Sequence, residues 1–144
     1  MRSSLISVLF SLLFFAADTG AGPAGPPVDY AARVLASLNH YRASHGLPPL
    51  QVAPSLSTLA AEHSYGMSTK GRPSHDGFSQ RFARAGGYLC VENVAHGFRV
   101  PEQVTLGWRA SPAHQRNLLD HRVRYAGVAN DGWFVTFFAC DETA

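Results

Sequence analysis

The sequence predicts an α+β domain in which helices pack against a small antiparallel sheet. Apolar residues recur at helical spacing through much of the chain, whereas residues 125–140 follow the pattern of strands. Two strand-like runs there flank Asn130-Asp131-Gly132, a sequence typical of a hairpin turn. Helices that precede a block of antiparallel strands indicate an α+β architecture. At 144 residues, the chain has the length of one domain with its own hydrophobic core.

The composition is that of a folded protein without a concentrated charge. Hydrophobic residues make up 46% of the chain and charged residues 15%, and the net charge at pH 7 is only +2. Domains that bind nucleic acid concentrate basic residues on one face, and here the arginines are dispersed. We therefore expect no nucleic-acid partner, and we expect the domain to be a monomer.

The N-terminus has the pattern of a secretory signal. Arg2 supplies a positive charge, Leu5 to Ala17 is an apolar run, and Thr19-Gly20-Ala21 is a plausible cleavage site. The run is too short to span a bilayer comfortably, and it lacks the amphipathic periodicity of a buried helix. A Gly- and Pro-rich linker follows, so we expect a secreted or periplasmic protein with no transmembrane segment after cleavage. The expected divisions are a signal peptide over 1–21, a linker over 22–27 and a domain over 28–142.

Two helices are predicted next. Apolar residues at helical spacing indicate the first helix over 29–45, and Gly46 ends it. The Pro-rich loop 47–50 separates it from a second helix over 54–68. His63 lies on the apolar face of this second helix. We interpret His63 as a hydrogen-bonded core residue rather than a metal ligand.

Turn residues and helix-start signals divide the middle of the chain into short elements. Pro101 and Pro112 each suit the first position of a helix, where the missing N–H costs no hydrogen bond. Ser111 precedes Pro112 and is a good N-cap residue. The predicted elements are a turn over 71–77, a helix over 78–85, a strand over 88–94, a helix beginning near 101, and a short helix over 111–119.

The predicted C-terminal strands cover residues 125–129 and 133–140. The second strand carries bulky residues on both faces, which indicates a central strand covered on both sides.

Cys90 and Cys140 are the only two cysteines, and an even number in an oxidising compartment favours a disulfide. Such a bridge would close a long loop and contribute about 4 kcal/mol. The alternatives are two buried free thiols or two thiol metal ligands.

Three ionisable residues stand out as candidates for a functional site. Glu92 lies among apolar residues in a predicted strand, where a carboxylate needs partners or water. His114 falls in the first turn of a predicted helix, whose positive end favours a neutral imidazole. His75 lies in a loop. Two histidines and one glutamate suit a zinc site with an open position, although the chain has no His-Glu-x-x-His motif. The alternative for His114 is that its ring only braces the turn.

Several motifs in this sequence together resemble the CAP superfamily of cysteine-rich secretory proteins, insect antigen 5 and plant pathogenesis-related proteins. The resemblance covers Val28 to Asp141 in the family's motif order, with the spacing of the compact bacterial branch. The motifs are Leu38-Asn39-His40-Tyr41-Arg42, Leu47-Pro48-Pro49-Leu50, Ser74-His75-Asp76-Gly77-Phe78, Glu92-Asn93-Val94, Trp108-Arg109-Ala110-Ser111-Pro112-Ala113-His114 and Asn117-Leu118-Leu119.

The resemblance implies an α-β-α sandwich with a three-stranded antiparallel sheet and a large cleft. Family members line the cleft with two histidines and two acidic residues that can hold zinc or a similar ion. By motif, His75 and His114 match the histidines and Glu92 matches one acid, whereas Ser111 stands where the second acid would be. The expected cleft residues are therefore His75, Glu92, Ser111 and His114, with His75, His114 and Glu92 as candidate ligands of zinc or another divalent cation. With one carboxylate the site is less anionic and should hold such a cation more weakly.

Two functions are compatible with these residues. The first is a secreted, non-catalytic binding module whose cleft recognises a lipid, a peptide or a cell-envelope component. No nucleophile with an evident base partner occurs in the motifs, which favours this hypothesis. The alternative is a zinc-assisted hydrolase with a metal-bound water as nucleophile and Glu92 and His114 as catalytic residues.

Overall fold

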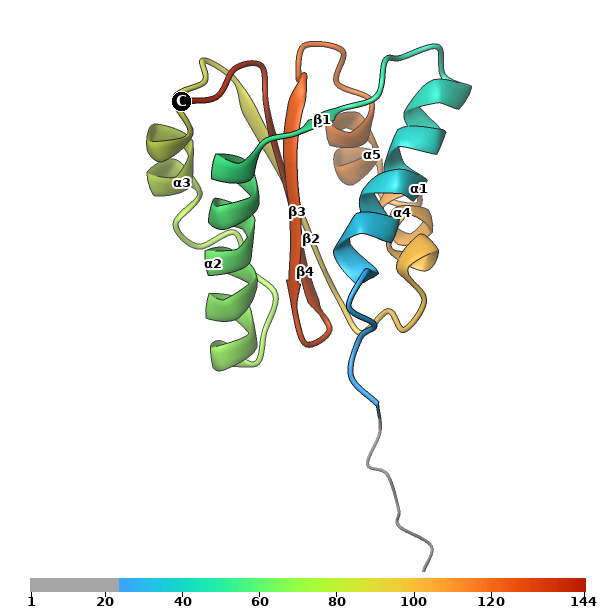
Figure 1. The fold of residues 1–144 in the computed structure, drawn as a ribbon, viewed down its shortest axis with the longest axis vertical. Helices are drawn as coiled ribbons and strands as arrows, with labels where there is room; N and C mark the ends of the chain where they lie inside the picture. The colour runs from blue at the N-terminus through green and yellow to red at the C-terminus, as the bar shows by residue number, and fades with distance from the viewer. Residues whose placement is uncertain (1–23) are drawn as a thin grey trace, which may run out of the picture.

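The computed structural model describes residues 24–144, in which five helices and four strands form one folded unit (Figure 1). The expected signal peptide, residues 1–21, lies outside the described residues. The helices and strands are α1 (Tyr30–Ser44), β1 (Gln51–Val52), α2 (Pro54–Lys70), α3 (Phe78–Ala85), β2 (Cys90–His96), α4 (Pro101–Arg109), α5 (Pro112–Leu118), β3 (Tyr125–Asp131) and β4 (Phe134–Cys140).

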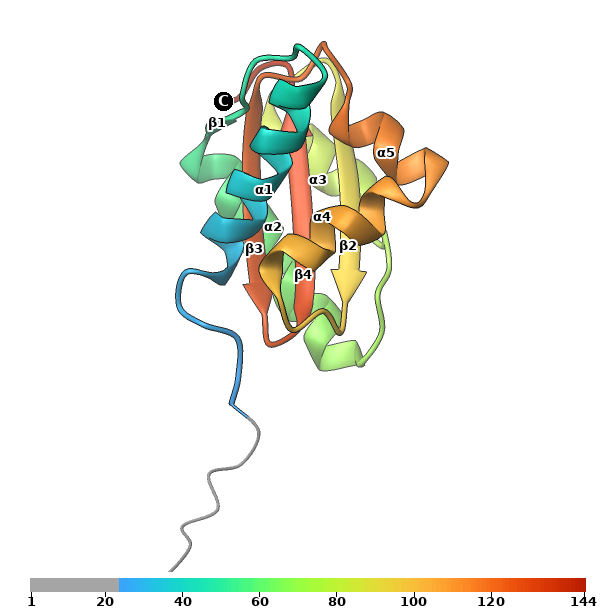
Figure 2. The same cartoon turned by 90° about the vertical axis from the view of Figure 1, so that its right-hand side faces the viewer.

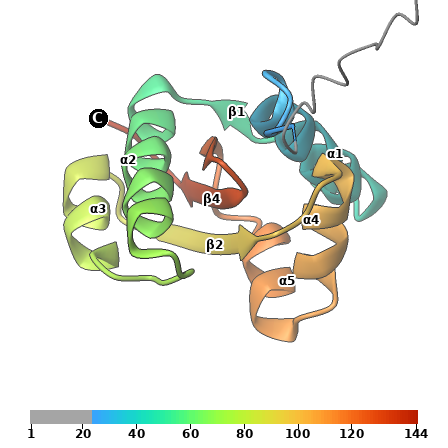
Figure 3. The same cartoon turned by 90° about the horizontal axis from the view of Figure 1, so that it is seen from below.

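Helices cover both faces of the sheet, as the sequence predicts. Figure 1 shows the sheet nearly edge-on, with α2 and α3 on one side and α1, α4 and α5 on the other. The view from below in Figure 3 shows the same three layers. The α-β-α sandwich is therefore confirmed. No helix among residues 24–144 is long and apolar enough to cross a membrane.

The sheet contains the three expected antiparallel strands and one further short strand. Its order is β1-β3-β4-β2, in which β3 and β2 both pair antiparallel with β4 (Figure 2). Strand β1 joins β3 in parallel through backbone bonds on either side of it, from Gln51 N to Arg124 O (2.9 Å) and from Ala53 N to Ala126 O (3.0 Å). Both side chains of β1 are exposed, so no hydrophobic alternation reveals this strand in the sequence.

Strand β4 is the central strand, which confirms the prediction from its bulky residues. All seven of its residues are buried. Val135 and Phe137 belong to the core under α1, α4 and α5, whereas Phe138 and Cys140 belong to the core under α2 and α3. The two-residue periodicity of the strand thus supplies both cores.

The first residues of two strands differ from the predicted ones. Strand β2 begins at Cys90 instead of residue 88, because the N–H groups of Tyr88 and Leu89 bond to the Asp141 carboxylate. Trp133 lies in the turn before β4, where its ring packs edge-on against Tyr30. In both cases tertiary contacts outside the local pattern set the boundary.

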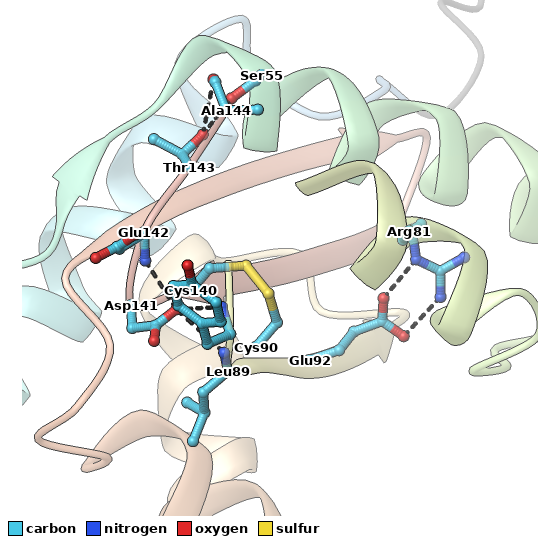
Figure 4. Close-up of a disulfide and its surroundings, with 11 residues drawn as sticks. Ser55, Arg81, Leu89, Cys90, Glu92, Cys140, Asp141, Glu142, Thr143 and Ala144 are labelled. Atoms are coloured by element: carbon cyan, nitrogen blue, oxygen red, sulfur yellow. Dashed lines mark hydrogen bonds and ion pairs between the residues drawn. A yellow bond between two sulfur atoms is a disulfide. The ribbon is translucent and has the colours of Figure 1, made fainter. Parts of the chain in front are cut away.

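The disulfide between Cys90 and Cys140 is confirmed, and residues 24–144 contain no free cysteine. The two residues lie directly opposite each other on β2 and β4, with their Cα atoms 4.1 Å apart. Figure 4 shows the bridge on the side of β2 that faces α3. The alternatives of two free thiols or two thiol ligands are therefore wrong.

Two residues of the motif 38–42, Asn39 and Arg42, form hydrogen bonds to the loop before β1. The amide of Asn39 donates to Leu50 O (3.1 Å) and accepts from Leu50 N (2.8 Å). Arg42 is fully buried and donates to the carbonyl oxygens of Pro48, Leu118 and Asp120. These side chains tie α1 to the loops at one end of the sheet, so their role is structural.

Candidate functional site

Glu92 on β2 is a buried carboxylate that forms an ion pair with an arginine. Only 1% of its side chain is exposed. Arg81 on α3 donates from Nε to Glu92 Oε2 (2.7 Å) and from Nη2 to Glu92 Oε1 (2.9 Å), as Figure 4 shows. This two-bond geometry is the strongest form of an ion pair between side chains. Burial of the carboxylate is thereby compensated.

Sequence reasoning missed Arg81, although a signal was present. Arg81 stands three residues after Phe78 and four before Ala85, so it shares the inward face of α3 with them. A charged residue on a buried helical face needs a buried partner. Glu92, in the strand that follows α3, is that partner in the structure.

His75 contacts the same carboxylate from the loop between α2 and α3. Its Nδ1 lies 2.8 Å from Glu92 Oε1, and 51% of its side chain is exposed. Because the carboxylate that receives both Arg81 bonds acts as an acceptor, Nδ1 carries the hydrogen and donates it. In the neutral ring, Nε2 is then left as an acceptor. His75 and Glu92, two of the expected cleft residues, are therefore in direct contact.

His63 is a satisfied core residue, as predicted, and it also lies beside Glu92. It is 7% exposed, and its Nε2 donates to Ser74 O across 2.7 Å. The same nitrogen is 3.7 Å from Glu92 Oε1. Burial lowers the pKa of His63, and this effect outweighs the opposing attraction of Glu92. The buried ring is therefore held neutral.

His114 lies in the first turn of α5, on the other side of β2. Burial lowers the pKa of His114, and electrostatic repulsion from the nearby imidazole of His75 lowers it further. The sequence predicted a neutral ring from the helix dipole, and the direction agrees although burial is the main cause. Asn93 fixes this part of α5 by donating from Nδ2 to His114 O (3.0 Å). The site thus extends over the edge of β2.

Two other motif residues close the outer edge of β2. Trp108 Nε1 donates to Val94 O (2.9 Å), and Asn117 Nδ2 donates to Glu92 O (3.0 Å). These carbonyls would otherwise point outward from an edge strand, where another strand could pair with them. The side chains therefore protect the edge and fix α4 and α5 against β2. Neither residue was assigned a role from the sequence.

The structure gives Ser111 the N-cap position of α5, although its side chain makes no capping hydrogen bond. Three of the surface cavities among the described residues measure about 370, 450 and 420 Å³, and none of these three is lined by an expected cleft residue. These cavities lie around His121 and Arg122 or Arg124. At the candidate site, the side chain of His75 is exposed and that of His114 is partly exposed.

A divalent cation does not fit the donor set as it stands. Among residues 24–144, no group of three or more His, Cys, Asp or Glu side chains is arranged to hold a metal ion. Both oxygens of Glu92 already accept hydrogen bonds, and the guanidinium of Arg81 places a positive charge against them. A second cation at the same carboxylate would be repelled.

The comparisons with known proteins agree with this architecture. The family described as "CAP: Cysteine-rich secretory protein family" matches residues 35–140. The uncharacterized protein YkwD of Bacillus subtilis (strain 168) is 30% identical over 111 residues, which cover 69% of this chain and 41% of YkwD.

Three solved structures from bacteria share the fold. An extracellular protein containing an SCP domain from Bacillus anthracis has a TM-score of 0.77 at 25% identity, covering 85% of this chain and 45% of that chain. A cysteine-rich secretory protein from Staphylococcus aureus has a TM-score of 0.73 at 17% identity, covering 81% and 40%. An outer surface protein from Borrelia burgdorferi has a TM-score of 0.68 at 20% identity, covering 81% and 98%.

This chain spans less than half the length of YkwD and of the Bacillus anthracis and Staphylococcus aureus chains. The family match nevertheless covers most of the chain, from α1 to the end of β4. The protein belongs to the CAP family, the cysteine-rich secretory protein family.

Proposed function

We propose that this protein is an extracytoplasmic binding module that contacts its ligand through His75 and His114, with Glu92 as the group that orients His75. The observation that carries the proposal is the 2.8 Å contact between His75 Nδ1 and Glu92 Oε1. This contact fixes the ring of a half-exposed histidine and leaves Nε2 free to accept a hydrogen bond. A side chain held in one orientation loses less entropy when it binds a ligand.

Binding is favoured over hydrolysis by the state of the reactive groups. Both cysteines are in the disulfide, and the Ser111 side chain makes no bond to a base among the described residues. Glu92 is too buried and too fully bonded to deliver a proton to or from water. No observation favours Glu92 and His114 as the catalytic residues of a zinc-assisted hydrolase.

The site favours a polar ligand. A neutral imidazole acceptor matches hydroxyl and amide N–H donors, which glycans and peptides of the cell envelope carry. None of the large exposed apolar side chains belongs to the residues assigned to this site, which disfavours a lipid there. These apolar side chains are Val28, Val52, Tyr65, Tyr88, Val100 and Leu106. The extracellular and outer-surface relatives support a location outside the cytoplasm.

The proposal is tested by co-sedimentation of the mature protein with purified peptidoglycan sacculi, with phospholipid vesicles in parallel. We expect binding to sacculi that is lost when His75 and His114 are both changed to Asn. The matched control is His40→Asn, because His40 is exposed on α1 and makes no contact with this site. Equal binding by the double variant would refute the site, and binding to vesicles alone would refute the ligand class.

A further inference from the structure

Three nitrogen atoms converge on one oxygen of the buried carboxylate. Around Glu92 Oε1 lie His75 Nδ1 at 2.8 Å, Arg81 Nη2 at 2.9 Å and His63 Nε2 at 3.7 Å. Two imidazoles and one carboxylate form a donor set that zinc uses in proteins. In this protein, the positive charge among these three side chains is the guanidinium of Arg81. This set includes His63, which sequence reasoning placed in the core, and it does not need His114.

We propose that Arg81 is a built-in cation that takes the place of a divalent metal among His63, His75 and Glu92. The protein then assembles this cluster without zinc, and it becomes a zinc-binding protein only when the guanidinium is removed. This inference concerns the assembly of the site. It goes beyond the proposed binding function and does not rest on it.

The position of Arg81 is fixed by contacts besides Glu92. Its Nη1 donates to Asp76 O across 2.8 Å, and its side chain is only 9% exposed. Gly77 leaves room beside it, since a Cβ there would lie 3.3 Å from Arg81 Nη1 and the backbone φ of +75° favours glycine. Arginine remains protonated at all physiological pH values. The positive charge at the carboxylate is therefore permanent.

The imidazole nitrogens of His63 and His75 that face the carboxylate both carry a hydrogen, so neither can bind a metal in this state. His63 Nε2 donates its hydrogen to Ser74 O, so this nitrogen has no lone pair for a cation. His75 Nδ1 donates to Glu92 in the same way. The nitrogen atoms that face the carboxylate are thus both donors. Zinc binding requires each ring to move its hydrogen to the other ring nitrogen, which an imidazole can do, and in the wild type it also requires the guanidinium to leave.

The test is zinc titration by calorimetry of the mature, tag-free protein and of Arg81→Met. We expect no zinc binding that depends on His75 in the wild type. Arg81→Met should bind one zinc ion at least roughly tenfold more tightly, the scale of outer-shell effects on metal affinity. The added binding should disappear in Arg81→Met combined with His75→Ala.

A matched control is available on the same helix. Arg84 on α3 also pairs with a carboxylate, that of Glu62, but both side chains are about half exposed at 55% and 50%. Arg84→Met should therefore leave zinc binding as in the wild type. Arg81→Lys keeps the positive charge and should also fail to gain zinc.

Thermal unfolding with and without zinc gives a second measurement. Zinc should raise the Tm of Arg81→Met and leave that of the wild type unchanged. If Arg81→Met does not fold, the wild type still decides the question. A rise in its Tm with zinc that is lost in His75→Ala would overturn the proposal, as would a folded Arg81→Met that gains no zinc binding.

Discussion

The imidazole of His75 donates from Nδ1 to Oε1 of Glu92, so an exposed loop is bonded to a buried strand residue 2.8 Å away. Arg81 bonds to the same carboxylate from α3. One side chain on β2 therefore anchors both the loop and the helix that follow α2. Loss of Glu92 should disturb this whole corner of the domain, and stability measurements can show how strongly the parts are coupled.

The pair of Arg81 and Glu92 should show strong coupling in a double-mutant cycle. Glu92→Gln leaves a buried guanidinium without its charge partner, and Arg81→Met leaves a buried carboxylate. Removing one partner of a buried pair costs about 3–5 kcal/mol. The double variant should lose clearly less than the sum of the two single losses, as measured by urea unfolding. Additive losses would mean that the pair is not formed in solution.

Gly127 should not tolerate even a methyl group. A Cβ at this position on β3 would overlap the backbone of Leu56 and Ser57 on α2. Gly127→Ala should therefore force the helix away from the sheet and destabilise the protein by several kcal/mol or prevent folding. The control is Gly66→Ala, which has open space in the middle of α2 and should stabilise the protein by up to about 1 kcal/mol. Thermal unfolding of both variants checks this contrast, and similar effects would contradict it.

Stability should fall between pH 7 and pH 5 because the folded protein keeps two histidines neutral. Burial lowers the pKa of His63 and of His114 below the ordinary value of 6.5, and His75 lowers that of His114 further. Between these pH values, His63 and His114 therefore bind more protons in the unfolded chain than in the folded protein. The stability contributed by neutral His63 and His114 is fully present above pH 6.5, and it is lost as the pH falls toward their lowered pKa values.

The comparison of His63→Gln with the wild type measures the part due to His63. A glutamine amide can still donate to Ser74 O but does not titrate. The midpoint of urea unfolding should therefore fall less in this variant than in the wild type between pH 7 and pH 5. An identical fall would show that His63 is not held neutral. Carboxylates such as Asp120, whose pKa is also lowered, act only at more acidic pH.

Reduction of the disulfide should lower the free energy of unfolding by about 4 kcal/mol. Cys90 and Cys140 are separated by 50 residues, and a loop of this size gives that value in the chain-entropy estimate. The measurement compares urea unfolding with and without reductant at the same pH. Thiol labelling of the unfolded, unreduced protein should find no free thiol at either cysteine, and labelling of both would show that the bridge does not form in the isolated protein.

The order and type of the main elements were predictable because each depends on local pattern. The apolar spacing of α1 and α2, the prolines that begin α4 and α5, and the hairpin before β4 are all signals within a few residues. Strand β1 was not predictable, because it consists of two exposed residues held only by backbone bonds to β3. Tertiary pairing alone defines it.

The candidate site was predictable in part. The motifs placed His75 and Glu92 together, and the structure shows their contact. The motifs did not reveal that Arg81 neutralises Glu92, because an ion pair between a helix and a strand has no fixed spacing in the sequence. For the same reason, His63 could be assigned to the core but not to the neighbourhood of Glu92.

The arrangement around Glu92 makes a direct prediction about ring tautomers. His75 donates from Nδ1 to Glu92, whereas His63 donates from Nε2 to Ser74 O, and both partners are acceptors. A long-range ¹H–¹⁵N NMR spectrum of the imidazoles at pH 8, assigned with His75→Asn and His63→Gln, reports the two rings separately. We predict the Nδ1–H tautomer for His75 and the Nε2–H tautomer for His63. An Nε2–H tautomer at His75 would contradict the claim that Glu92 holds this histidine in place.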